Sequence, residues 1–208
     1  MKLSLYTNPM SRGRMVRWML EEIGQPYDTE IVPYGPGMKG PEYRAINPMG
    51  KVPALRHGDV VVTETSAIIA YLADAFPEAR LAPPPANPLR GTYYRWLFFT
   101  AGCLEAAVTD KALGFAVPEG RERMCGYGTF EAVMDVLEAA VSKSTYLLGE
   151  DFSAADVYLG SQIGFGMSFG MVDKRPAFEA YFDRMQARPA LQRATEIDDK
   201  LMAEASAA

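Results

Sequence analysis

The sequence has little cysteine and almost no histidine. Its two cysteines, Cys103 and Cys125, show no CxxC spacing, which argues against both a disulfide framework and a zinc cluster. The single histidine, His57, lies between two short apolar runs, where we expect a turn residue rather than a catalytic base. Chemistry without a metal is therefore expected.

Long apolar runs and an excess of basic residues are also lacking. No apolar run approaches the roughly 20 residues that a membrane helix needs, and the start is too soon broken by Pro9 for a signal peptide. The net charge of −5 argues against general nucleic-acid binding, which requires a basic face. We therefore expect a cytoplasmic protein with neither membrane nor nucleic acid as partner. Its 208 residues, 49% of them hydrophobic, suffice for one large domain or two small ones.

The first part of the chain has an α/β pattern. Alternating residues predict a strand at 2–7, and an amphipathic stripe predicts a helix from Ser11 to Gly24. A second strand is expected at 27–32, so the two strands should be parallel. A hairpin at 53–62 and a helix at 65–76 follow.

Five prolines between Pro77 and Pro88 predict a stiff linker. We therefore expect a first domain at 1–77, a linker at 78–88 and a second domain at 89–208. No strand pattern occurs in the second domain, and residues 202–208 are expected to fray. Helices are predicted at 93–108, at 130–141, after Ser153, and at 178–185. Ser153 and Asp156 have the spacing of a capping box, to which we assign a structural role.

The strongest functional signal lies in residues 47–69. Pro53 stands at the start of an apolar run, and because proline lacks an N–H it belongs at a strand edge. The neighbouring backbone is then available to an extended ligand chain. The helix start at Thr65 offers free N–H groups to a carboxylate. Lys51 and Glu64 add one charge of each sign, which suits a zwitterionic peptide.

These motifs resemble a known family. Asn-Pro-Met-Gly-Lys-Val-Pro-Ala-Leu at 47–55, followed by Glu-Thr-Ser-Ala-Ile-Ile-Ala-Tyr-Leu at 64–72, is similar to the glutathione-binding half of glutathione S-transferases. In that family the proline after valine is cis, and the residue pair at the helix start holds the γ-glutamyl end of glutathione. Mapped onto this chain, the family's positions are Pro53, Glu64 and Thr65. The residue pattern adds Lys51 and the Val52 backbone to the expected glutathione site, and Arg12 either adds positive potential there or is a solvated charge. The family usually has serine at the position of Thr65, whose hydroxyl is expected to preserve binding.

The resemblance also implies an architecture. The first domain should be an α/β thioredoxin-like domain, and the second an all-α helical bundle that contributes the hydrophobic substrate site. A homodimer is implied, with glutathione as co-substrate and no metal.

Two hydroxyl groups compete for the task of activating the glutathione thiol. The thiolate is the nucleophile, and a hydroxyl that donates to the sulfur near a helix N-terminus stabilises it. Ser11 lies at a helix start and resembles the serine-type, theta-like bacterial branch of the family, whereas Tyr6 lies at a strand end, as in other branches. We favour Ser11, although serine before a helix is usually a plain N-cap. Arg14 is expected to be a solvated charge.

The favoured function is a cytoplasmic glutathione transferase that adds the thiol to small hydrophobic electrophiles in detoxification. Candidates for the electrophile site are Met10, Tyr34, Met38, Phe99 and Phe115. On the same scaffold, an isomerase, a dehalogenase or a reductive cleavage enzyme is an alternative. A non-catalytic interaction module is an alternative of another class, against which the retained Lys51, Glu64 and Thr65 speak.

Overall fold

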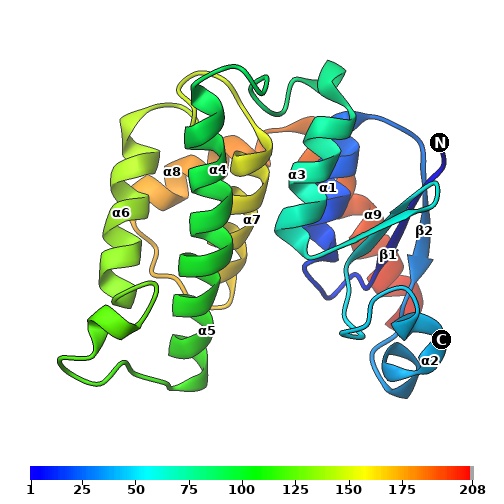
Figure 1. Ribbon diagram of the computed structural model, residues 1–208, viewed down its shortest axis with the longest axis horizontal. Coiled ribbons are helices and arrows are strands. Elements are labelled where there is room, and N and C mark those ends of the chain that lie inside the picture. The colour runs from blue at the N-terminus through cyan, green and yellow to red at the C-terminus, as the bar shows by residue number, and fades with distance from the viewer. Residues whose placement is uncertain (207–208) are drawn as a thin grey trace. The chain divides into compact units, whose positions relative to one another are not determined.

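The computed structural model describes residues 1–206 and divides the chain into two compact units (Figure 1). The first unit comprises Met1–Arg80 together with the residues from Ala187 onward, and the second comprises Leu81–Gln186. The elements of the first unit are β1 (Leu3–Thr7), α1 (Gly13–Ile23), β2 (Tyr27–Ile31), a 3-10 helix (Pro36–Lys39), α2 (Pro41–Arg44), β3 (Ala54–His57), β4 (Val60–Thr63), α3 (Thr65–Ala75), a second 3-10 turn (Pro77–Ala79) and α9 (Pro189–Ser206).

The four strands form one mixed sheet in the order β2-β1-β3-β4. β1 and β2 are parallel, and β3 is antiparallel to both β1 and β4. The predicted strand-helix-strand unit and hairpin are therefore confirmed. This mixed sheet with its helices is the thioredoxin-like domain that the resemblance implies.

One face of the sheet forms the core of the first unit. Leu3, Leu5 and Thr7 are buried, whereas Ser4 and Tyr6 between them are less buried, because side chains alternate between the two faces of a strand. α1 packs against β1, and α3 packs against both α1 and β3. α1 and α3 therefore cover the face that carries Leu3, Leu5 and Thr7.

The last helix, α9, belongs to the first unit and packs along α1 (Figure 1). Arg17 of α1 and Asp198 of α9 form an ion pair of 2.8 Å, and both side chains are only 1% exposed. Burial raises the pKa of Asp198, and the Arg17 guanidinium opposes that rise. This ion pair helps to hold α9 on α1. The residues from Ala187 onward therefore belong to the first compact unit, whereas from the sequence we expect them in a second domain at 89–208.

From the sequence we predict no helix after residue 185, whereas α9 runs from Pro189 to Ser206. The expectation that residues 202–208 fray is wrong as far as Ser206, where the helix ends, while Ala207 and Ala208 lie outside the described residues. Pro189 at its first position suits a helix start.

The second unit is helical throughout its regular structure. Its elements are α4 (Leu89–Phe99), a π-helical turn (Thr100–Leu104), α5 (Glu105–Leu113), a 3-10 turn (Glu122–Met124), α6 (Phe130–Lys143), α7 (Ala154–Ser168) and α8 (Pro176–Gln186). The predicted helix at 93–108 is therefore interrupted by the π-helical turn. Tyr93, Leu137, Ile163 and Phe178 are among its buried core residues.

Asp156 connects three segments of the second unit. Its Oδ2 accepts hydrogen bonds from the N–H and the hydroxyl of Ser153, which confirms the predicted capping box. Its Oδ1 accepts from the Leu147 N–H and from the Tyr181 hydroxyl of α8, both at 2.8 Å. Its structural role is therefore larger than that of a helix cap alone.

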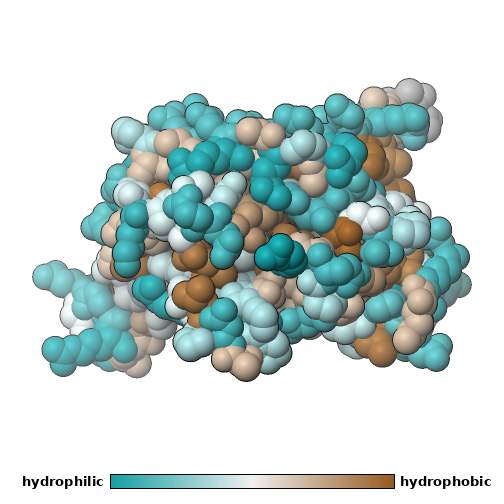
Figure 2. Space-filling view, turned by 90° about the horizontal axis from the view of Figure 1, so that it is seen from above, coloured by the Kyte–Doolittle hydropathy of each residue, from teal (hydrophilic) through white to brown (hydrophobic). Residues whose placement is uncertain are grey.

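Polar residues cover most of the surface seen in Figure 2, and apolar residues appear as smaller areas among them. Among residues 1–206, none of the helices combines the length and the apolar character needed to cross a bilayer.

Candidate functional site

The segment before β3 presents an open backbone edge. The Val52–Pro53 peptide bond is cis, as expected from the resemblance. β3 begins at Ala54, which is paired with Tyr6 of β1. Within residues 1–206, no backbone hydrogen bond reaches the N–H or the C=O of Val52. These two groups are therefore available to an extended ligand backbone.

The loop that leads to this edge is held by side chains that sequence reasoning missed. The Tyr43 hydroxyl and the Asn47 amide both donate to the Lys51 carbonyl, at 2.9 and 2.7 Å. Lys39 Nζ donates to the Gly50 carbonyl at 2.6 Å. Burial, helped by Tyr6, raises the pKa of Tyr43 to about 12, so its hydroxyl remains a donor at neutral pH.

Gly50 is required in this loop for two reasons. Its φ is +56°, a conformation that L side chains rarely adopt. A Cβ added there would also lie 2.7 Å from the Met38 carbonyl oxygen. The glycine in the Asn-Pro-Met-Gly motif therefore permits the close approach of two loops, which the sequence signalled only as a turn.

The start of α3 lies just after β4. Glu64 occupies the N-cap position with an exposed side chain, and no side chain caps the helix. Thr65, the first helical residue, is buried. Free N–H groups at a helix N-terminus attract an anion, and a nearby carboxylate attracts a cation. This helix start can thus hold both charges of an amino-acid end group.

Glu64 adopts φ 69° and ψ 122°, which is unusual for a residue with a side chain. Such a conformation costs roughly 1–3 kcal/mol and is common at functional sites. We predict that Glu64→Gly raises the free energy of unfolding by about 1 kcal/mol, because glycine removes that cost. Urea unfolding of the two proteins measures the change. A loss of stability would show that the backbone at residue 64 is not strained.

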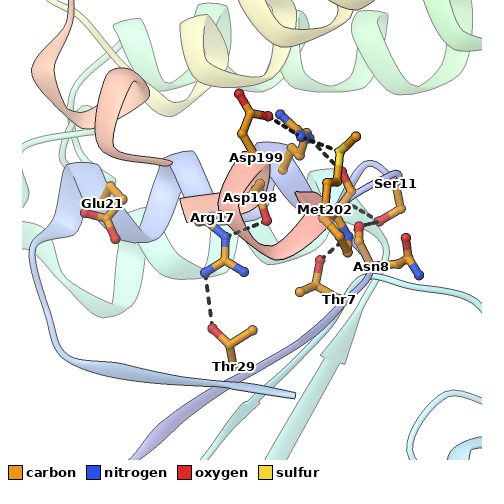
Figure 3. Close-up of polar contacts among 12 residues, drawn as sticks. Thr7, Asn8, Ser11, Arg17, Glu21, Thr29, Asp198, Asp199 and Met202 are labelled. Carbon is orange, nitrogen blue, oxygen red and sulfur yellow. Dashed lines mark hydrogen bonds and ion pairs between the residues drawn. The ribbon is translucent and has the colours of Figure 1, made fainter. Parts of the chain in front are cut away.

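Ser11 lies in the loop between β1 and α1. Its hydroxyl donates to the Asn8 carbonyl at 2.7 Å and accepts from the Gly13 N–H at 2.9 Å (Figure 3). α1 begins at Gly13 with Arg12 as N-cap, so the expected cap position of Ser11 is wrong, although its hydroxyl still serves the first helical N–H. A hydroxyl has one proton, which Ser11 directs to Asn8 in this conformation.

Gly13 allows the hydroxyl groups near the start of α1 to approach the helix closely. A Cβ at this position would lie 1.9 Å from Thr7 Oγ1 and 3.0 Å from Ser11 Oγ. The Thr7 hydroxyl is fully buried and donates weakly, at 3.5 Å, to the same Asn8 carbonyl. Ser11 and Thr7 therefore share one acceptor.

Tyr6, the other candidate for thiol activation, projects from the opposite face of the sheet to Thr7. Its ring lies 6.3 Å from the ring of Tyr43 and 5.8 Å from the Arg56 guanidinium. Since α1 covers the Thr7 face, the structure separates the environment of Tyr6 from that of Ser11.

The two arginines after Ser11 differ. Arg12 is exposed at the N-cap position. Arg14 is not the solvated charge that the sequence suggests, because its Nε donates to the Pro9 carbonyl at 2.6 Å and its Nη2 to Asp199 at 2.7 Å. The helix α9, which supplies Asp199, is the element that the sequence pattern misses.

The apolar candidates for the electrophile site differ in exposure. In the first unit Met10 and Tyr34 are exposed and the Tyr34 hydroxyl donates to the Met10 carbonyl at 3.4 Å, whereas Met38 is buried and offers little surface to a ligand. In the second unit Phe115 is exposed and Phe99 is partly buried.

In the part of the chain that the structure describes, no group of three or more His, Cys, Asp or Glu side chains is placed to hold a metal ion. Cys103 and Cys125 are both free thiols of intermediate burial. His57 ends β3 and its Nδ1 lies 2.9 Å from the Tyr71 hydroxyl.

Comparison with known proteins agrees with this geometry. The model of the glutathione S-transferase N-terminal domain matches residues 10–75, and that of the C-terminal domain matches residues 127–189. Glutathione S-transferase 3 of Zea mays is 29% identical over 206 residues, with 92% of each chain covered.

Two solved structures are similar over nearly the whole chain. A glutathione transferase from Methylococcus capsulatus has a TM-score of 0.79 at 30% identity, covering 95% of this chain and 98% of the other. A glutathione transferase homolog from Sulfitobacter with bound glutathione has a TM-score of 0.75 at 30% identity, covering 97% and 99%.

Proposed function

Because the chain belongs to the glutathione S-transferase family and is a glutathione transferase, we propose how its own residues hold and activate glutathione. The tripeptide lies extended along the Val52–Pro53 edge, and its cysteinyl backbone pairs with the N–H and C=O of Val52. The observation that carries this proposal is the Val52 backbone, which is unpaired within residues 1–206. Two residues on, Ala54 pairs with Thr63, which leads directly into the start of α3. Lys39, Tyr43 and Asn47 fix that edge before the ligand arrives, which lowers the entropic cost of binding.

The γ-glutamyl end of glutathione binds at the start of α3. Its carboxylate accepts hydrogen bonds from the free N–H groups and from the Thr65 hydroxyl, and its ammonium pairs with the exposed Glu64 carboxylate. The exposed side chain of Lys51 supplies a cation for a carboxylate of the tripeptide. The unusual backbone of Glu64 supports this role, since strained residues cluster at ligand sites.

Ser11 activates the thiol by donating a hydrogen bond to the sulfur, which stabilises the thiolate as the thiol proton passes to water. Its hydroxyl turns from the Asn8 carbonyl to the ligand, while its oxygen continues to accept from the Gly13 N–H. The N-terminus of α1 and the exposed Arg12 add positive potential that favours the thiolate. The position of Tyr6 on the other face of the sheet supports Ser11 as the donor.

The thiolate then attacks a small hydrophobic electrophile. A carbon–sulfur bond forms, and the electron pair of the broken bond leaves with the departing group or is protonated after addition. The exposed apolar side chains Met10 and Tyr34 in the first unit and Phe115 in the second are candidates for contact with this substrate, together with the partly buried Phe99. We further propose a cytoplasmic homodimer that acts in detoxification.

The function is tested by calorimetry with glutathione and by turnover of a chromogenic electrophile. We predict that Thr65→Val, which removes the hydroxyl but keeps the shape, weakens glutathione binding about tenfold. Thr65→Ser retains the hydroxyl and should bind like the parent. Absence of glutathione binding at millimolar concentration in the parent protein would reject the proposal.

A further inference from the structure

Arg14 joins the last helix of the chain to the loop that carries Ser11. Its Nε donates to the carbonyl of Pro9, two residues before Ser11, at 2.6 Å. Its Nη2 donates to Asp199 at 2.7 Å and lies 2.9 Å from Met202 Sδ. One guanidinium therefore contacts the loop backbone on one side and α9 on the other. Figure 3 shows Asp199 and Met202 of α9 near the loop that carries Asn8 and Ser11.

α9 is itself a fixed support. Asp198, the neighbour of Asp199, is buried and paired with Arg17 of α1. Arg17 also donates to the hydroxyls of Tyr27 and Thr29 in β2, both at 3.1 Å. The carboxylate of Asp199 is thus carried by a helix whose register against α1 and the sheet is set in the core.

The loop between Asn8 and Ser11 is also held at its first residue. The Asn8 amide donates to the Val32 carbonyl at 3.1 Å and accepts from the Met10 N–H at 3.0 Å. The Asn8 carbonyl accepts the Ser11 hydroxyl. Arg14 adds the hold at Pro9, so a shift of Pro9 would displace the group that orients Ser11.

We propose that Arg14 and Asp199 are positioning residues, through which α9 sets the loop that aims the Ser11 hydroxyl at glutathione. This inference rests on the proposed role of Ser11. A misplaced donor is costly because a shift of 1 Å in a catalytic group can lower a rate by a large factor. In this proposal α9 contacts no reacting atom and acts on the thiol only through the position of the Ser11 loop.

The sign of the effect separates positioning from simple electrostatics. Asp199→Asn removes a negative charge and leaves Arg14 less neutralised, which by charge alone would favour the thiolate and lower the thiol pKa of bound glutathione. If Asp199 holds Arg14 on the loop, the same variant weakens the hydrogen bond from Ser11 and raises that pKa. The two explanations therefore predict opposite shifts.

The test titrates the thiolate absorbance of enzyme-bound glutathione against pH, beside kcat and KM for a chromogenic electrophile. We predict that Asp199→Asn raises the thiol pKa by about half a unit and lowers kcat about threefold to tenfold, with KM for glutathione nearly unchanged. Asp199→Glu, which keeps the carboxylate, should restore part of the loss. Arg14→Lys should lose as much as Asp199→Asn, because one ammonium does not reproduce the planar fork of the guanidinium.

The matched control is Arg193→Gln. Arg193 of α9 pairs with Glu21 of α1 at 3.1 Å, so it joins the same two helices without contacting the loop of Ser11. Its loss should leave the thiol pKa and kcat unchanged. An unchanged or lower thiol pKa in Asp199→Asn, or an equal effect of Arg193→Gln, overturns the inference alone. An unchanged thiol pKa in Ser11→Ala rejects the proposed role of Ser11 and the inference with it.

Discussion

Replacement of Ser11 by alanine is expected to lower glutathione conjugation about tenfold to a hundredfold at pH 6.5, with little change in glutathione affinity. A hydrogen bond to a charged group contributes roughly 1.5–3 kcal/mol, and each pKa unit corresponds to about 1.4 kcal/mol. Loss of the Ser11 donor should therefore raise the thiol pKa of bound glutathione by about one to two units.

The loss in Ser11→Ala should depend on pH in a defined direction. A free thiol has a pKa near 8.5, so at pH 6.5 only about one per cent is thiolate without help from the protein. Above about pH 9 the thiol ionises unaided, and the difference between the two proteins should disappear. The rate of conjugation measured from pH 6 to pH 9.5 records this convergence.

Tyr6→Phe is the control for Ser11→Ala, because it removes the competing hydroxyl from the other face of the sheet. Its rate should stay within about twofold of the parent, as expected for a group that does not touch the sulfur. If Tyr6→Phe loses activity and Ser11→Ala does not, the thiol is activated by Tyr6. We expect Tyr6→Phe to keep its activity, because Tyr6 packs against Tyr43 and away from Ser11.

Asp156→Ala should produce the largest loss of stability. Its carboxylate is fully buried and accepts four hydrogen bonds, from Leu147, from Tyr181 and twice from Ser153. Burial raises the pKa of Asp156, and these hydrogen bonds oppose the rise. Alanine leaves these four donors, which lie in three segments of the second unit, without this acceptor, so we expect a loss of about 3–5 kcal/mol in urea unfolding.

Thr129→Ala provides the matched control for Asp156→Ala. Thr129 also caps a helix of the second unit, because its hydroxyl oxygen accepts from the Ala132 N–H at 3.1 Å, but this bond is exposed. Its loss should cost about 1 kcal/mol, the usual effect of one N-cap. Equal losses in the two variants would mean that Asp156 acts as a cap and no more.

Signals of short range predicted much of this fold. The alternation in 2–7, the proline at 53 and the spacing of Ser153 and Asp156 each report on a few neighbouring residues, and the structure agrees with all three. The packing of α9 on α1 was not predicted, because the partner of Asp198 is Arg17, 181 residues away in the chain. The position of Arg17 between apolar residues of the first helix was the available clue. An arginine that is buried there needs an acidic partner, which Asp198 provides.

In the candidate site, too, features carried by neighbouring residues could be predicted, and features that depend on distant residues could not. The residues that meet a ligand by resemblance, such as Glu64 and Thr65, lie in one continuous motif and could be named from it. The groups that hold them, such as Lys39 and Tyr43, act through backbone carbonyls, which carry no mark in the sequence. Arg14 was assigned to solvent for the same reason as α9 was missed, because Asp199 is distant in the chain.

The place of α9 in the first unit also affects when that unit can finish folding during synthesis. A ribosome makes the chain from its N-terminus, so β1 to α3 leave it long before Asp198 is made. Until then the Arg17 guanidinium lacks the Asp198 carboxylate with which it forms its buried ion pair. A nascent chain stalled before residue 198 contains all four strands of the sheet but lacks most of α9, the helix that packs along α1. Translation must therefore pass residue 198 before the first unit can be completed, although most of that unit is encoded first.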